Sequence, residues 1–202
     1  MPIIDGSLSG NPMDGNRQFS VITSPTIEPI TLTELKTFGR IDGTDEDTLI
    51  GGFITAARNA CEGYLARALI KQKVRMYLDY WPGMEIELPR PPLISVEGVY
   101  TVDEDDVLTL YDDDNYFVVD SLDPAKLVIR NGCTPPSNTD RYTAGYIIDF
   151  WAGYGTAGED VPALIREGIK LWVMQIYEQR TLTPDPPPDA KCLIEQYRLI
   201  RY

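Results

Sequence analysis

The chain has 202 residues, of which 43% are hydrophobic and 24% charged, so it can bury a core as one domain with an insertion or as two small domains. Its formal net charge of −13 argues against affinity for nucleic-acid phosphates. The lack of histidine excludes Ser-His-Asp and Cys-His nucleophile systems, together with histidine-containing metal sites.

The three cysteines, Cys61, Cys133 and Cys192, are odd in number and widely spaced, which fits neither a disulfide framework nor a zinc motif. We interpret them as reduced packing residues of a cytoplasmic protein. The N-terminus has no basic stretch followed by an apolar one, so we expect no signal peptide. No apolar run approaches the ~20 residues that are needed to span a bilayer.

Residues 1–29 are rich in Gly, Pro, Ser and Asn, which is typical of a mobile arm or of an extended strand that needs a partner to order it. The motif TLTE, which begins at Thr31, is a capping box and predicts a short helix over residues 32–38. The motif IDGTDED then supplies a turn and a new helix cap at Thr44 or Asp45.

A longer helix is predicted over residues 46–68, because its apolar residues recur at spacings of three and four. The helix is also rich in small residues, including Gly51 and Gly52, and each glycine costs up to ~1 kcal/mol of helix stability relative to alanine. Either this helix is loosely formed, or its small residues let a neighbouring helix approach closely, including a helix from another subunit.

From Lys71 the apolar residues alternate with polar ones, as in KQKVRMYLDYW, which predicts a half-buried strand. Further strands are predicted at MEIEL, ISVEGVYTV, VLTLY, NYFVV, KLVIR and YTAGYIIDFWA. Clusters of turn-forming residues separate them. Short strands at this spacing indicate an antiparallel sandwich or a small barrel.

The last long helix is predicted over residues 162–180, beginning at a proline. The segment TLTPDPPPD that follows is expected to be a stiff, extended linker, since consecutive prolines favour polyproline II. We call residues 190–202, AKCLIEQYRLIRY, the tail, and expect a short helix followed by an extended basic and aromatic tip. The tail either packs on its own domain or docks on a partner; we favour docking, with the linker holding the tail away from the body.

The stretch GYGTAGEDVP, residues 153–162, spells G-x-G-x-x-G between a predicted strand and a predicted helix. A dinucleotide site needs a further strand after the helix, whereas a proline-rich linker follows here. Glu159 and Asp160 would also repel an anion at the start of the helix. We therefore interpret this glycine loop as a structural turn and expect no bound cofactor.

Nine acids and no base lie between Asp103 and Asp123. Their spacing lacks the central glycine and distal glutamate of an EF-hand, so we interpret them as solvated hairpin tips, with adventitious cation binding as the alternative. A carboxylate pair with glycosidase chemistry is a further alternative, although no acid belongs to a recognisable aromatic-lined cleft. We expect no catalytic residue and no metal site.

The ordered combination of RIDGTDEDTLI, LPRPPL, a helix ending in YEQR, and a terminal YRLIRY resembles the head–tail connector, or head-completion adaptor, proteins of long-tailed bacteriophages and gene-transfer particles. The resemblance covers roughly residues 28–202. It implies a structural virion protein without enzymatic activity. Such adaptors form a ring, usually of twelve subunits, beneath the portal protein; the ring extends the DNA channel and provides the platform for the stopper or tail.

The resemblance further implies a place at the head–tail junction of the virion, after assembly in the host cytoplasm, with DNA passing through the ring without specific binding. The tail would reach the portal protein. The residues expected to dock there are Tyr197, Arg198, Leu199, Ile200, Arg201 and Tyr202. The shortest family members are nearly all helical, so the β-rich middle goes beyond their pattern.

The predicted fold is therefore α+β: a small antiparallel helical bundle with an inserted antiparallel β-module, sandwich or barrel, and extended arms at both ends. The expected parts are an arm (1–29), the helical bundle (30–70 and 153–181), the β-module (71–152) and the linker with the docking tail (182–202). The residues expected to pack the helices are Gly51, Gly52, Phe53, Tyr64, Trp172 and Ile176. The main alternative is a β-rich carbohydrate-binding module or a carboxylate-dependent hydrolase.

Overall fold

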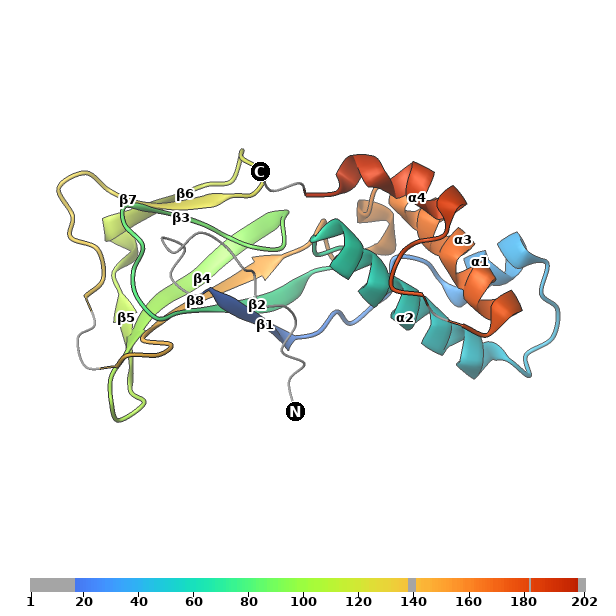
Figure 1. Ribbon diagram of the computed structural model, residues 1–202, viewed down its shortest axis with the longest axis horizontal. Helices are drawn as coiled ribbons and strands as arrows, with labels where there is room; N and C mark the ends of the chain where they lie inside the picture. Colours follow the sequence, from blue (N-terminus) through green and yellow to red (C-terminus); the bar gives the residue numbers. More distant parts are fainter. Residues whose placement is uncertain (1–16, 138–140, 182, 200–202) are drawn as a thin grey trace. The chain divides into compact units, whose positions relative to one another are not determined.

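The computed structural model describes residues 17–137, 141–181 and 183–199, and the chain divides into two compact units (Figure 1). One unit, the β unit, contains the described residues of Met1–Ser24 together with Gln72–Gly153. The other, the helical unit, contains those of Pro25–Lys71 and Tyr154–Tyr202. Within the described ranges, no helix has the length and apolar character that crossing a membrane would take. The predicted α+β class is confirmed.

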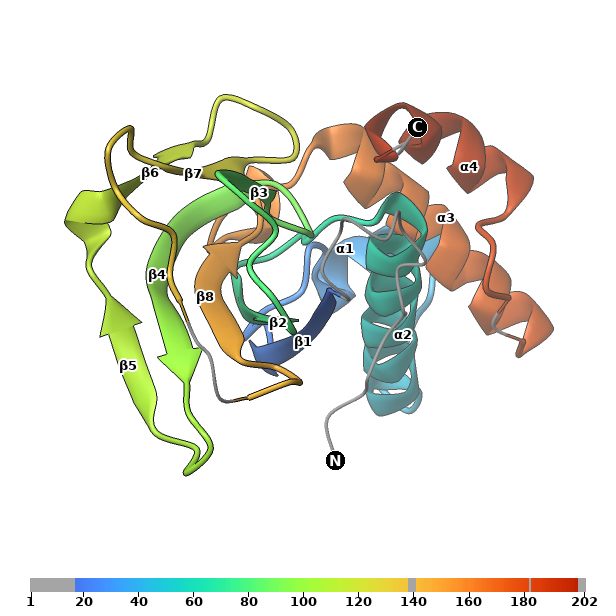
Figure 2. The same cartoon turned by 60° about the vertical axis from the view of Figure 1, so that its left-hand side comes forward.

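The β unit is built on a five-stranded antiparallel sheet in which β8 is the central strand (Figure 2). Along β2 the side chains alternate between buried and half-buried, as the period of two in the sequence predicts. The strands in spatial order are β1 (Gln18–Thr23), β2 (Gln72–Leu78), β8 (Tyr146–Ala152), β4 (Leu93–Val102) and β5 (Leu108–Tyr111).

A second, three-stranded antiparallel sheet belongs to the same unit, in the order β3 (Glu85–Glu87), β7 (Lys126–Ile129) and β6 (Tyr116–Val119). Apolar side chains of both sheets are buried, among them Met76, Phe150 and Leu127. Removing these side chains from water is the main force that stabilises the unit.

An ion pair with a buried carboxylate links β2 to the central strand β8. Asp149 on β8 is 2% exposed, and it lies directly opposite Arg75 on β2. The guanidinium donates two parallel hydrogen bonds to the carboxylate, from Nε to Oδ1 and from Nη2 to Oδ2, each 2.7 Å long. This two-point geometry compensates the cost of burying the carboxylate.

The helical unit contains α1 (Leu32–Gly39), α2 (Asp47–Leu65), α3 (Ala163–Gln179) and α4 (Pro188–Ile194). The predicted capping box opens α1: the Thr31 hydroxyl accepts from Glu34 N–H, and the Glu34 carboxylate accepts from Thr31 N–H at 2.7 Å. One cluster of buried side chains joins the helices. Its largest member, Trp172, is fully buried, and Ile176 is 3% exposed.

Three predicted boundaries are wrong for local reasons. Helix α2 ends at Leu65 rather than at residue 68, because Ala66 adopts a left-handed conformation with φ of 54°. Strand β8 starts at Tyr146 rather than at residue 142, since Ala144 has φ of 52°. The prolines also extend less far as a linker than expected, because Pro188 is the first residue of α4, where a proline is tolerated.

Part of the predicted arm is ordered as a strand. Residues 18–23 form β1, which pairs antiparallel with β2 and meets the expectation that an extended segment would need a partner. The rest of the arm up to residue 16 lies outside the described residues.

Candidate functional site

The glycine loop is held by its own carboxylate. Asp160 Oδ2 accepts a hydrogen bond of 2.9 Å from Ala157 N–H, and a side chain at Gly155 would overlap the carboxyl group of Asp160. A Cβ at Gly158 would lie 2.8 Å from the carbonyl oxygen of Pro29. The acid therefore occupies the place beside the loop that a phosphate would need, as expected for a structural turn.

The YEQR helix end secures the start of α2. Tyr177 donates a hydrogen bond from its hydroxyl to Glu46, and Arg180 Nη2 donates to Glu46 Oε1 at 2.9 Å. Arg180 also stacks over the Tyr177 ring, 4.9 Å from its centroid. The hydrogen bond from Tyr177, together with Arg180, lowers the pKa of Glu46. The motifs RIDGTDEDTLI and YEQR, which both carry the family resemblance, therefore contact each other in the folded chain.

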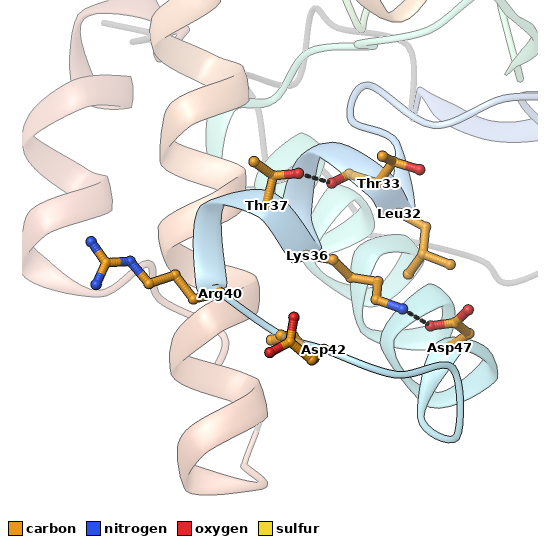
Figure 3. A pocket seen from close by; sticks show the side chains of 8 residues that line it. Leu32, Thr33, Lys36, Thr37, Arg40, Asp42 and Asp47 are labelled. Atoms are coloured by element: carbon orange, nitrogen blue, oxygen red, sulfur yellow. Dashed lines mark hydrogen bonds and ion pairs between the residues drawn. The ribbon is translucent and has the colours of Figure 1, made fainter.

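A shallow hollow of about 480 Å³ lies between α1 and the loop that leads to α2 (Figure 3). Its lysine, Lys36, forms an ion pair of 2.6 Å with Asp47, and the Thr37 hydroxyl donates to Thr33 O at 2.8 Å. Arg40 points away from the other side chains that line the hollow (Figure 3). These polar groups stabilise the junction of two helices, and their arrangement does not resemble a catalytic site.

The first part of the tail packs on the helical unit, which corrects the expectation that a linker holds it away from the body. Ala190 and Ile194 on α4 are fully buried, and Ile194 belongs to the main cluster. Leu199 N–H donates to Leu65 O at 3.0 Å. Packing on the chain's own domain was the less favoured of the two alternatives, because a run of prolines favours an extended linker.

Tyr64 on α2 is the anchor for the end of the described tail. Its hydroxyl donates to Glu195, and the guanidinium of Arg198 lies 4.8 Å from its ring centroid. Arg67 Nε donates to the Tyr197 carbonyl oxygen. The hydrogen bond from Tyr64 lowers the pKa of Glu195, while burial and the same bond raise the pKa of Tyr64.

The predicted docking residues therefore divide into two groups. Tyr197 and Leu199 are half-buried against the helical unit, whereas Arg198 is exposed on its outer side. Ile200, Arg201 and Tyr202 lie outside the described residues. The structure brings the first three together around α2 and leaves their role in docking as a prediction.

The predicted helix-packing residues also divide. Trp172 and Ile176 lie in the buried cluster, with Phe53 and Tyr64 packed against it half-buried. Among the described residues, no atom lies within 4 Å of a Cβ built at Gly51 or Gly52, so no described helix approaches closely there. Close approach by a helix of the described ranges is therefore wrong for these glycines; approach by another subunit stays a prediction.

A buried charge network in the helical unit escaped the sequence analysis. Arg58 and Glu62 on α2 are each 6% exposed, and Arg58 Nη1 lies 3.2 Å from Glu62 Oε2. Arg58 Nε donates to Glu28 at 2.7 Å, while Glu62 accepts from Leu69 N–H at 2.8 Å. The signal was an Arg-Glu pair at i and i+4 beside the apolar stripe of α2.

The acid-rich turn at Asp112–Asp114 places three exposed carboxylates within 4.8 Å of one another. Asp112 Oδ1 accepts from Asp114 N–H at 3.0 Å, which is an ordinary turn contact. Clusters of this kind are common on solvated surfaces, and we assign no site to it.

Comparison with known proteins finds one matching family model and several solved structures of similar fold. Residues 29–105 match the family model described as phage gp6-like head–tail connector protein. No curated protein sequence matches the chain. A chain in the neck of an empty gene transfer agent (GTA) particle, computed with C6 symmetry, shares 25% identity and a TM-score of 0.79, covering 91% of this chain and 96% of its own length.

Two further GTA structures contain a chain of the same fold. A chain of the native GTA virion has 26% identity and a TM-score of 0.74 over 91% of this chain and 96% of its own. A chain in the native GTA neck, computed with C12 symmetry, has 25% identity and a TM-score of 0.70, covering 90% of this chain and 97% of its own length. The family match and the shared fold confirm the predicted resemblance to head–tail connector proteins, which are structural proteins of the virion.

Proposed function

We propose that this protein forms a ring under the portal protein of a phage or gene-transfer particle, extends the DNA channel, and carries the stopper or tail. The observation that carries the proposal is the fold shared with a neck protein over 91% of this chain. The C6 and C12 symmetries of the two neck structures support a ring, and we propose that it contains twelve subunits. Assembly in the host cytoplasm would precede incorporation at the head–tail junction.

The charge of the chain suits a conduit for DNA. A net charge of −13 per subunit would keep the duplex from adhering to the wall of the ring, so DNA would pass without specific binding. We further propose that the protein has no catalytic activity, because the polar clusters described above are used in structural contacts.

We propose that the tail docks on the portal with α4 as its fixed base. Residues 197–199 are held by α2, and Arg198 keeps an exposed face from which it can reach a portal carboxylate. Arg201 and Tyr202 would supply a second cation and an aromatic anchor beyond that base. Because α4 is already packed, docking would not have to order this helix, which limits the entropy lost.

The proposal is tested with DNA-filled heads that carry the portal but lack this protein. Added full-length protein should form a ring at the portal vertex in electron micrographs and make the heads competent to join tails. A chain without residues 200–202 should fold normally and attach poorly, while Glu178→Gln, at an exposed position of α3, should attach normally. Heads that join tails equally well without the protein would contradict the proposed function.

A further inference from the structure

The five-stranded sheet of the β unit ends on both sides in a strand with one free edge. Among the described residues, β1 pairs with β2 alone and β5 pairs with β4 alone. Figure 2 shows the two strands at opposite ends of the same sheet. A free edge presents a row of backbone N–H and C=O groups that can pair with a strand of another chain.

Both edge strands also expose apolar side chains. On β1, Val21 and Ile22 are 39% and 41% exposed. On β5, Leu108 and Leu110 are 47% and 62% exposed. Exposed apolar residues gathered on an open strand are typical of surfaces that become buried in an assembly.

The two ends of the sheet differ in charge, which points to the occupant. The β5 end, residues 93–115, has eight acids and no base. On β2, Lys73 and Arg75 are paired within the chain with Glu97 and Asp149, so the charge of the β1 edge is that of residues 17–23, which contain Arg17 and no acid. Two β5 edges would therefore repel each other, whereas a β1 edge would attract a β5 edge.

We propose that the β1 edge of one copy pairs with the β5 edge of the next copy. This inference rests on the proposed ring and names the surface that closes it. A contact between two different patches of identical chains is head-to-tail, and it generates a ring whenever the rotation closes. Each copy offers one edge of each kind, so every contact leaves one β1 edge and one β5 edge for the next copies.

Disulfide cross-linking between two proteins that each carry one introduced cysteine tests the pairing. Ile22→Cys and Leu110→Cys are each made in full-length protein that also carries Cys133→Ser and Cys192→Ser, since the remaining Cys61 is buried. Oxidation of mixed rings should give disulfide dimers containing one chain of each kind. Either variant oxidised alone should give none, and a chain with both cysteines should give a ladder of multimers.

The same cross-linking is carried out on rings attached to heads, so that a protein that is monomeric when free is still tested. Rings visible at the portal without any Ile22–Leu110 cross-link would overturn the inference and leave the proposed function standing. Cross-linked dimers of Leu110→Cys alone would overturn it in favour of a two-fold contact. Absence of any ring on the heads would instead contradict the proposed function.

A charge reversal tests the proposed pairing of β1 with β5 independently of the cross-linking. Asp113→Lys with Asp114→Lys should raise the protein concentration needed for ring formation roughly tenfold at low salt, and less at high salt, because salt screens the lost attraction. Glu178→Lys with Asp189→Lys makes the same change in net charge at exposed positions of the helical unit and should have little effect. Equal effects of the two double variants would exclude a specific role for the β5 edge.

Discussion

The helical unit packs its own tail against its helices, whereas the β unit leaves two strand edges open among the described residues. In the helical unit the tail covers the apolar face of α3, with Ile194 fully buried, and Leu199 N–H bonds to Leu65 O. In the β unit the last strand of the larger sheet has Leu110 62% exposed. The units differ because of the elements from which they are built.

A helix pairs nearly all its backbone groups internally, so a bundle needs only its apolar stripes covered. An open sheet always has two edges, and backbone groups at an edge must find water or another strand. A chain that must assemble can therefore use a bundle as its stable body and a sheet as its connecting part.

The largest expected effect concerns the Arg75–Asp149 ion pair of the β unit. Arg75→Met should lower the free energy of unfolding by about 3 kcal/mol, because Asp149, 2% exposed, loses both hydrogen bonds from the guanidinium and retains Lys73 Nζ at 3.6 Å. Urea denaturation followed by circular dichroism measures the change.

A matched double variant separates lost pairing from lost packing. Arg75→Met with Asp149→Leu also removes the buried carboxylate that has lost its arginine, and it should be more stable than Arg75→Met alone. If both proteins lose the same stability, the sheet depends on the shape of the arginine and not on its charge.

An intermediate effect is expected where the tail meets α3. Ile194→Ala should cost about 2 kcal/mol of stability, since the side chain is fully buried in the main cluster. Gln196→Ala, two residues later at an exposed position, should change stability by less than about 0.5 kcal/mol. Equal melting temperatures for the two variants would mean that the tail does not contribute to the core.

The smallest effect has the opposite sign. Gly52→Ala should stabilise the protein by roughly 0.5–1 kcal/mol, because alanine favours a helix and no atom lies within 4 Å of the added Cβ. Gly155→Ala is the contrasting variant and should destabilise it, since the new methyl group meets the Asp160 carboxyl. Thermal unfolding of both variants and of the parent protein measures these changes. A Gly52→Ala protein less stable than the parent would indicate a close neighbour of α2.

Local signals in the sequence predicted the regular elements well. The Thr31 capping box located α1, and the period of two located β2, because each pattern reports the backbone directly. Packing of the tail on its own domain was the less favoured alternative, because a run of prolines predicts extended chain, whereas Pro188 is the first residue of a helix. Long-range pairs such as Arg75 with Asp149 depend on strand register, which no local pattern contains.

The same limit applies to the candidate surfaces. The YEQR motif carried the family resemblance, yet its partner Glu46 lies in a distant motif and became visible only in the folded chain. The acids around β5 were read as solvated hairpin tips. The role that we propose for them in assembly depends on the strand order, which puts β5 at the end of the sheet opposite to β1.

The register of β2 against β8 has a consequence for how the chain could tolerate so large an insertion. Gln72 is the first residue of the β unit after α2, and it pairs with Ala152, one residue before that unit ends at Gly153. Once folded, the insertion therefore holds its entry and exit side by side. For the helices on either side it acts as a short turn rather than a loop of roughly 80 residues, so its length adds little closure entropy.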